Sequence, residues 1–131
     1  MPDCTIRRID EMEAVVFGSF KRARAELHVE SFGMQVLELP PSNTRYPEHD
    51  HAQDGQEEVY VVLRGDGEIE VDGERHRIDE ETMVRVGAEA RRKVWSGERG
   101  MRLLVLGGVP GGVYVAPEVT KLGAPDPGWV I

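Results

Sequence analysis

The chain has 131 residues, of which 31% are charged, and a formal net charge of -8 at pH 7. This length suits one domain with a substantial core, and the acidic balance argues against a nucleic-acid surface, which must be basic. No apolar run approaches the ~20 residues of a transmembrane helix, and the N-terminus lacks the apolar core of a signal peptide. The single cysteine, Cys4, leaves no pair for a disulfide. We expect a cytoplasmic protein that binds neither nucleic acid nor membrane.

The first segment, residues 1–30, carries a weak helical pattern. Asp10 and Glu13 have the three-residue spacing of a capping box. Four apolar residues follow at helical spacing: Val16, Phe20, Ala23 and Leu27. Because Gly18 interrupts this pattern, we expect only one or two short helical turns that pack against the outside of a sheet.

Residues 31–108 consist of short segments typical of strands. The expected strands are residues 31–39, 45–51, 58–63, 68–71, 75–78, 82–86, 91–95 and 101–106. Pro-Pro at 40–41 ends the first strand, and Asp-Gly at 72–73 is a hairpin signal. Glycines at 65–67 and 97–100 are expected to turn the chain between neighbouring strands. Strands this short and this regularly spaced predict an all-β antiparallel sandwich or barrel.

The last segment, residues 109–131, is rich in proline and glycine. We expect an irregular but ordered tail that lies over the barrel or over a neighbouring subunit. The chain therefore divides into an N-terminal segment at 1–30, a barrel at 31–108 and a tail at 109–131.

The residues with the clearest chemistry are His49, His51 and Glu58. Two histidines at i and i+2 on extended chain point to the same side. Two imidazoles and one carboxylate, with coordination positions left open, suit a non-haem transition metal. Two other interpretations stay open: surface histidines in a polar loop, and a rim carboxylate paired with an arginine.

The strand that begins at Glu58 places Tyr60 and Val62 on the same face as the carboxylate. Because the alternate residues are also apolar, we expect this strand to be buried on both faces. A carboxylate that faces an interior is costly unless it is paired or bound to a metal. Tyr60 is either a core residue with a satisfied hydroxyl or a substrate-binding residue beside the metal.

These residues closely resemble the first conserved motif of the cupins: His49-x-His51, then Glu58, then Gly-Asp-Gly at 65–67. The resemblance implies a cupin-type double-stranded β-helix, or jelly-roll barrel. It also implies that His49, His51 and Glu58 bind a divalent transition metal, with Fe, Mn, Ni, Cu and Zn all suited to these ligands. Small cupins commonly dimerise, so a homodimer is expected, and the tail is a candidate for crossing to the partner.

The second cupin motif is degenerate in this chain. Its positions read Glu81, Gly87, Glu89, Arg92 and Ser96. Arg92 stands where the family has its fourth ligand, a histidine, and a guanidinium offers no lone pair to a metal. If strand alternation directs Arg92 inward, we expect it to bind a carboxylate or other anion of the substrate. The alternative places Arg92 and its basic neighbours outside.

Two classes of function follow from the resemblance. The first is a small metal-dependent enzyme, dioxygenase-like or isomerase-like, that acts on a small organic molecule, an anionic one if Arg92 binds it. The second is a non-catalytic module that binds or senses a small ligand and holds metal weakly or not at all. No catalytic residue is assigned beyond the metal ligands. His28 and His76 lack partners at ligand spacing and are expected at the surface.

Overall fold

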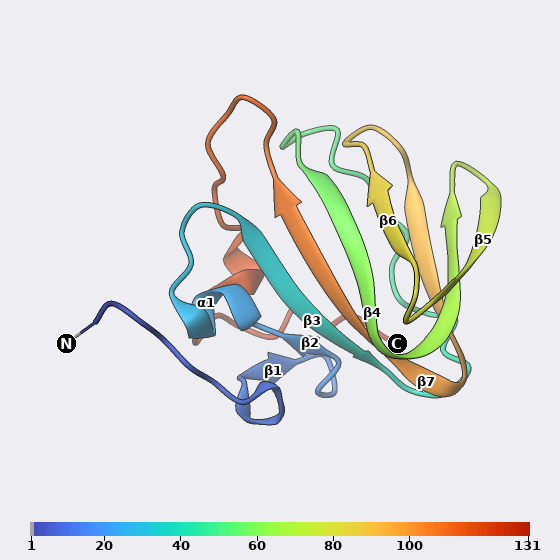
Figure 1. The fold of residues 1–131 in the computed structure, drawn as a ribbon, viewed down its shortest axis with the longest axis horizontal. Coiled ribbons are helices and arrows are strands. Elements are labelled where there is room, and N and C mark those ends of the chain that lie inside the picture. The colour runs from blue at the N-terminus through green and yellow to red at the C-terminus, as the bar shows by residue number, and fades with distance from the viewer. Residues whose placement is uncertain (1) are drawn as a thin grey trace.

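The structure is a computed structural model that describes residues 2–131. Its strands are β1 (Ala14–Val15), β2 (Phe20–Lys21), β3 (Gly33–Leu39), β4 (Glu57–Val71), β5 (Glu74–Asp79), β6 (Met83–Val86) and β7 (Arg92–Gly108). They form one antiparallel sheet in the order β1-β2-β3-β7-β4-β5, with β6 paired to β4 (Figure 1). The helical elements are α1 (Ala23–Leu27) and two short 3-10 turns, η1 (Ile9–Glu11) and η2 (Glu118–Thr120). The all-β class with a short N-terminal helical segment is confirmed.

The sheet is organised by its two long strands, β4 and β7, which pair from Glu57 with Gly108 to Val71 with Arg92. The expected breaks at 65–67 and 97–100 were wrong, because the chain bends at both places without leaving the sheet (Figure 1). Gly65 has a φ of 87°, and a Cβ on it would lie 2.2 Å from the carbonyl oxygen of Gly100. Irregular pairing around Gly65 lets the sheet curl into a barrel while its ladder continues.

The N-terminal segment differs from its expected helical pattern. Three successive residues, Val16, Phe17 and Gly18, have positive φ and form the turn between β1 and β2. Within residues 2–131, only α1 is an α-helix. Asp10 and Glu13 do not cap a helix, since each binds an arginine side chain from another element. Helical spacing therefore failed here because long-range ion pairs and a tight hairpin override a weak local preference.

One face of β4 points into the core and the other is partly open. Glu58, Tyr60 and Val62 are buried, whereas Leu63 is 40% exposed. The expectation that β4 is buried on both faces was wrong, because its outer face lacks a covering layer, as is common in antiparallel sheets. The inner face is continuous with the main core, in which Ile69 and Leu103 are fully buried.

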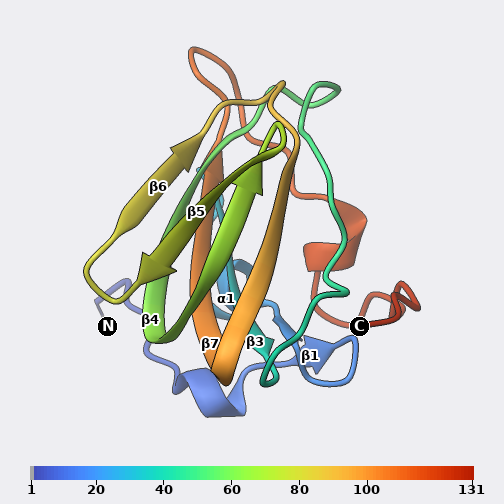
Figure 2. The same ribbon diagram turned by 90° about the vertical axis from the view of Figure 1, so that its right-hand side faces the viewer.

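Residues 109–131 follow β7 as an irregular tail that contains η2. The tail lies beside the segment that precedes β4 (Figure 2), and Trp129 near its end packs edge-on against Phe20 and Tyr46. No helix within residues 2–131 is both long enough and apolar enough to cross a membrane.

Candidate metal centre

The segment with the two histidines is attached to the start of β7 by its backbone. The expected strand at 45–51 is reduced to one bridge, in which His49 N–H donates to Arg92 O (3.0 Å) and Arg92 N–H donates to His49 O (2.8 Å). The His51 N–H donates to the carbonyl of Ala88 (2.8 Å). Pro47 has no N–H to extend a ladder. These bonds place both histidines opposite Glu58, the second residue of β4.

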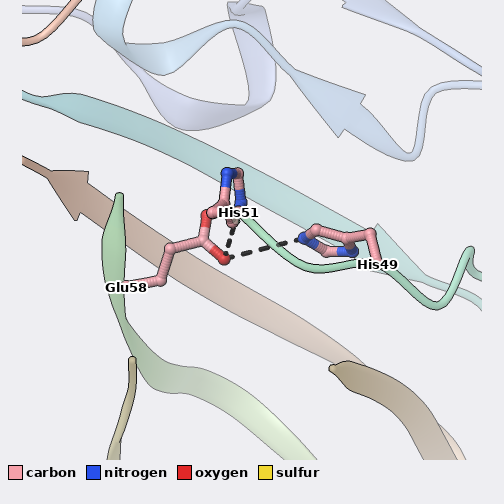
Figure 3. A group of neighbouring side chains, drawn as sticks. All are labelled: His49, His51 and Glu58. Carbon is pink, nitrogen blue, oxygen red and sulfur yellow. Dashed lines mark ion pairs between the residues drawn. The ribbon is translucent and has the colours of Figure 1, made fainter. Parts of the chain in front are cut away.

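The side chains of His49, His51 and Glu58 converge on one point (Figure 3). One potential ligand atom from each lies within 4.8 Å of the others. The Nε2 atoms of His49 and His51 are 3.6 Å and 3.3 Å from Glu58 Oε1. Two ligands about 2.1 Å from a common ion lie roughly 3.0 to 3.4 Å apart for right-angled to tetrahedral coordination. The separation to His51 lies in this range and that to His49 lies 0.2 Å above it, so the three side chains form a candidate site for a single divalent metal ion.

The outer nitrogens of both imidazoles face acceptors. His51 Nδ1 lies 3.0 and 3.1 Å from the two carboxylate oxygens of Asp54, and His49 Nδ1 lies 3.3 Å from the carbonyl of Pro47. Such acceptors favour the tautomer with the proton on Nδ1, which leaves the Nε2 lone pair free for a metal. His51 Nε2 is buried and has no hydrogen-bond partner among the described residues, so its lone pair is available to a metal.

Glu58 is held as an anion by its surroundings. Burial alone would raise the pKa of its carboxyl, but His49, His51 and the hydroxyl of Tyr60 outweigh burial and hold this pKa far below its usual range. Tyr60 donates a 2.7 Å hydrogen bond to Glu58 Oε1. In return, the Glu58 carboxylate raises the pKa of His51. Burial raises the pKa of Tyr60 well above its usual value, so its hydroxyl keeps the proton that it donates.

Arg92 points inward, one of the two directions that the sequence left open, and is only 1% exposed. The alternative that places Arg92 outside with its basic neighbours is therefore wrong. Its neighbour Arg91 does face outward, with a side chain that is 54% exposed. Arg92 Nη2 donates to the carbonyl of Gly87 (2.6 Å), and Nη1 lies 3.5 Å from Glu58 Oε1. The guanidinium therefore neighbours the same carboxylate oxygen as the two histidines. Its binding of a substrate anion stays a prediction.

A cavity of about 670 Å³ opens beside the three converging side chains. Barrel residues such as Leu37, Tyr60 and Val105 form one wall, and Val119 and Trp129 from the tail form another. Tyr60 thus lies where the sequence places a substrate-binding residue, although its hydroxyl donates to Glu58. The predicted substrate contact of Tyr60 stays a prediction.

Known structures share the fold of this chain. A cupin protein from Bacteroides fragilis matches with a TM-score of 0.67 at 18% identity, over 89% of this chain and 93% of its own. The chain has the cupin fold. An RmlC-like cupin from Desulfovibrio desulfuricans (TM-score 0.54, 22% identity) covers 60% of this chain and 73% of its own. The cupin domain of an XRE-family transcriptional regulator from Enterobacter cloacae (0.53, 21%) covers 63% and 86%. No protein-family model and no curated protein matches the sequence.

Several residues of this cupin site were missed by sequence reasoning. Asp54, which orients His51, had a usable signal, because it follows His51 by three residues in a polar loop. Trp129 had none, since its contact with Phe20 joins opposite ends of the chain. His28 and His76 are exposed and lie away from the converging side chains.

Proposed function

We propose that this chain is a small metal-dependent cupin enzyme, dioxygenase-like or isomerase-like, that acts on a small organic molecule. His49, His51 and Glu58 would hold the metal, with Fe, Mn, Ni, Cu and Zn as candidates. The observation that supports this most strongly is His51 Nε2, which is buried, unpartnered and 3.3 Å from Glu58 Oε1 beside a cavity. When bound, such a metal supplies Lewis-acid or redox chemistry at the cavity wall.

The chain's own residues would prepare this centre. Asp54 and the Pro47 carbonyl fix the orientation of the imidazoles, and Tyr60 fixes the Glu58 carboxylate. Partners of this kind commonly change metal affinity 10- to 100-fold. No side chain is assigned a proton-transfer role.

Arg92 is proposed to bind a substrate anion through its free donors. Its Nε and Nη1 lack hydrogen-bond partners within residues 2–131, so they have capacity for an oxygen ligand. Because Arg92 is 1% exposed and does not line the cavity, this role requires the Glu58 side chain to move aside and let the anion reach the guanidinium. The test is Arg92→Ala, with binding of a panel of small carboxylic acids measured by calorimetry in the metal-loaded protein. Unchanged binding of every acid would remove this role.

A second candidate is a non-catalytic cupin that binds or senses a small ligand with weak or no metal. The position of Arg92 favours it, because a fixed positive charge 3.5 Å from Glu58 Oε1 competes with a cation for that carboxylate. The two candidates agree on the cavity and differ in metal affinity and turnover.

Metal titration is the first experiment. Protein stripped with a chelator is titrated with Mn²⁺, Ni²⁺, Zn²⁺ and, without oxygen, Fe²⁺ by calorimetry. We expect saturable binding that weakens more than about 100-fold in His51→Ala and Glu58→Ala. His76→Ala is the matched control, because it removes an exposed imidazole on β5. Absence of saturable binding in the unaltered protein would reject the metal centre.

Turnover is tested next on the loaded protein. Oxygen consumption and product formation are measured with Fe²⁺ and a panel of small hydroxy, keto and aromatic compounds. Turnover supports the enzyme, whereas tight metal binding without turnover of any compound favours the binding module.

The homodimer implied by the family resemblance stays a proposal. Trp129 packs on Phe20 and Tyr46, and in a dimer the tail would make these contacts either with its own barrel or with that of the partner. Sedimentation of the full chain and of a form truncated before Pro125 shows whether a dimer forms and whether it depends on the tail. A dimer that persists after truncation would use a surface other than the tail.

A further inference from the structure

The strand register separates two ends of the cavity beside the proposed metal centre. Glu58 pairs with Gly107 at one end, whereas Leu37 pairs with Leu103, four residues away along β7, and with Phe20. The polar end is lined by His49, Asp50, His51, Asp54 and Glu58. The other end is lined by apolar and aromatic side chains, among them Phe20, Leu37, Tyr46, Val119 and Trp129. The polar end accounts for the metal centre, but it leaves the larger apolar end without an assigned role.

The apolar end is built around three aromatic rings. The ring of Trp129 lies 5.7 Å from that of Phe20 at 87°, and 6.3 Å from that of Tyr46 at 85°. Edge-to-face contacts of this kind hold rings in fixed relative positions. A planar or ring-shaped ligand gains the most contact with such a wall.

The charges around the cavity disfavour an anion at this end. No lysine or arginine lines the cavity in the part of the chain that the structure describes, and its charged wall residues are Asp50, Asp54 and Glu58. An anionic group in the apolar end would lose its hydration without gaining a counter-charge. Arg92 lies behind Glu58, where it donates to Gly87 O. A negative group would therefore be accepted only at the polar end, and there, with Glu58 in its observed position, only by the proposed metal, since the charged side chains at that end are carboxylates.

The tail wall is fixed in position by the barrel. The buried guanidinium of Arg22 donates to the carbonyls of Val119 (2.9 Å) and Ala124 (3.0 Å). Asp126 accepts a hydrogen bond from the backbone N–H of Val16 (2.9 Å). A wall held in this way needs little ordering when a ligand enters. The volume of the cavity, about 670 Å³, is within the range of sites for small organic molecules, roughly 300 to 1,000 Å³.

We propose that the apolar end binds the uncharged, ring-containing part of an organic ligand, with Trp129 as its main contact. Any acidic or chelating group of the ligand lies at the polar end. This inference rests on the proposed function only for what happens at the polar end, because the apolar wall is complete without a metal.

The test uses two fluorescent probes that share one ring system. N-phenyl-1-naphthylamine is uncharged, and 8-anilinonaphthalene-1-sulfonate adds a sulfonate. Each is titrated into the full chain in the presence of a chelator. We expect the uncharged probe to bind at least about tenfold more tightly than the sulfonate, because desolvation of the anion is not compensated. Equal or tighter binding of the sulfonate would overturn the proposal.

Substitutions locate the bound probe. Trp129→Ala is expected to weaken the uncharged probe about tenfold, and Trp129→Phe to retain most of its affinity. Trp95→Ala is the matched control, because Trp95 lies under Arg75 (3.7 Å) on another part of the sheet. Equal effects of Trp129→Ala and Trp95→Ala would overturn the assignment, and so would full binding in Trp129→Ala with an unchanged melting temperature.

The two proposals fail separately. Loss of metal binding with retained preference for the uncharged probe would reject the metal enzyme alone. Metal binding without that preference would reject the apolar ligand site alone.

Discussion

Two buried arginines anchor two regions of the molecule and differ in how well their donors are used. Arg22 and Arg92 are both 1% exposed. Arg22 donates from Nε and Nη2 to carbonyls of the tail, and its Nη1 pairs with Glu13. Arg92 donates only from Nη2, to Gly87 O, and its Nε and Nη1 have no hydrogen-bond partner among the described residues.

This difference separates a structural region from a functional one. A buried guanidinium is costly unless its donors are matched. Around Arg22 every nitrogen has a partner, so the group joins the tail to β2 and to the N-terminal segment. Around Arg92, Nε and Nη1 have no hydrogen bond among the described residues, and Nη1 has only an ion pair at 3.5 Å with Glu58 Oε1. Buried polar groups without a hydrogen bond call for an explanation, which we take to be functional here. Arg22, whose donors all have partners, thus lies behind the tail wall of the cavity. Arg92, whose donors do not, lies beside the proposed metal centre.

The largest expected effect is on stability, from Arg22→Ala. This change leaves Glu13 and the tail carbonyls without their partner, and we expect a loss of about 3 kcal/mol in the free energy of unfolding. Urea denaturation measures it. Arg77→Ala, which removes a side chain that is 71% exposed, is the control and should change stability by less than about 0.5 kcal/mol. A similar small change in both variants would show that Arg22 does not hold the tail.

The next effect concerns Arg92, which has fewer hydrogen-bonded donors than Arg22. Arg92→His replaces a charge that competes for Glu58 with an imidazole at the position of the family's fourth ligand. We expect metal affinity to rise about tenfold, or ~1.4 kcal/mol, in calorimetric titrations of chelator-stripped protein. Arg91→His is the matched control, because its exposed side chain lies next in sequence and outside the site. Weaker metal binding in Arg92→His than in the control would contradict a competing role for Arg92.

A comparable effect of opposite sign is expected for Asp54→Ala. Asp54 accepts from His51 Nδ1 at 3.0 Å, so its loss frees the imidazole to turn and removes the preference for one tautomer. Metal affinity should fall about tenfold, with little change in stability because Asp54 is 44% exposed. Glu48→Ala removes a negative charge from the same loop without a contact to His51, and it should leave affinity within about twofold. If both variants lower affinity alike, net charge and not orientation is responsible.

The sequence predicted those parts of the molecule that depend on local pattern. Asp-Gly at 72–73 has the positive φ values that its hairpin requires, whereas strand alternation left the direction of Arg92 open. The spacing of His49, His51 and Glu58 anticipated that they would meet. Glycines at 65–67 were misinterpreted as a turn, because a glycine that bends a strand and one that ends it leave the same local signal.

What the sequence did not predict depends on contacts between distant residues. The tail wall arises from bonds such as Arg22 to Ala124 and Asp126 to Val16, which join the two ends of the chain. No periodicity encodes such pairs. Helical spacing around Val16 was likewise overridden by the hairpin that presents its N–H to Asp126.

The smallest expected effect is an acid-induced loosening of the tail. It separates the contribution of Arg22 to holding the tail from that of two carboxylates, Glu13 and Asp126. The backbone N–H of Gly123 lowers the pKa of Glu13, and the backbone N–H groups of Gly128 and Val16 lower that of Asp126. Because these pKa values are lowered by folding, both carboxylates stabilise the tail at neutral pH, and this contribution is lost as the pH falls through and below about 4.

Fluorescence of Trp129 in a Trp95→Phe background reports this loosening between pH 6 and pH 3. We expect its emission to shift to longer wavelength before the circular dichroism of the sheet changes, because the barrel core is apolar and does not depend on these carboxylates. Asp126→Asn should show part of this shift already at pH 6, since a neutral amide is a weaker acceptor for the Val16 N–H. If emission and circular dichroism change together in both proteins, the tail and barrel unfold as one unit, and the tail wall is as stable as the sheet that it covers.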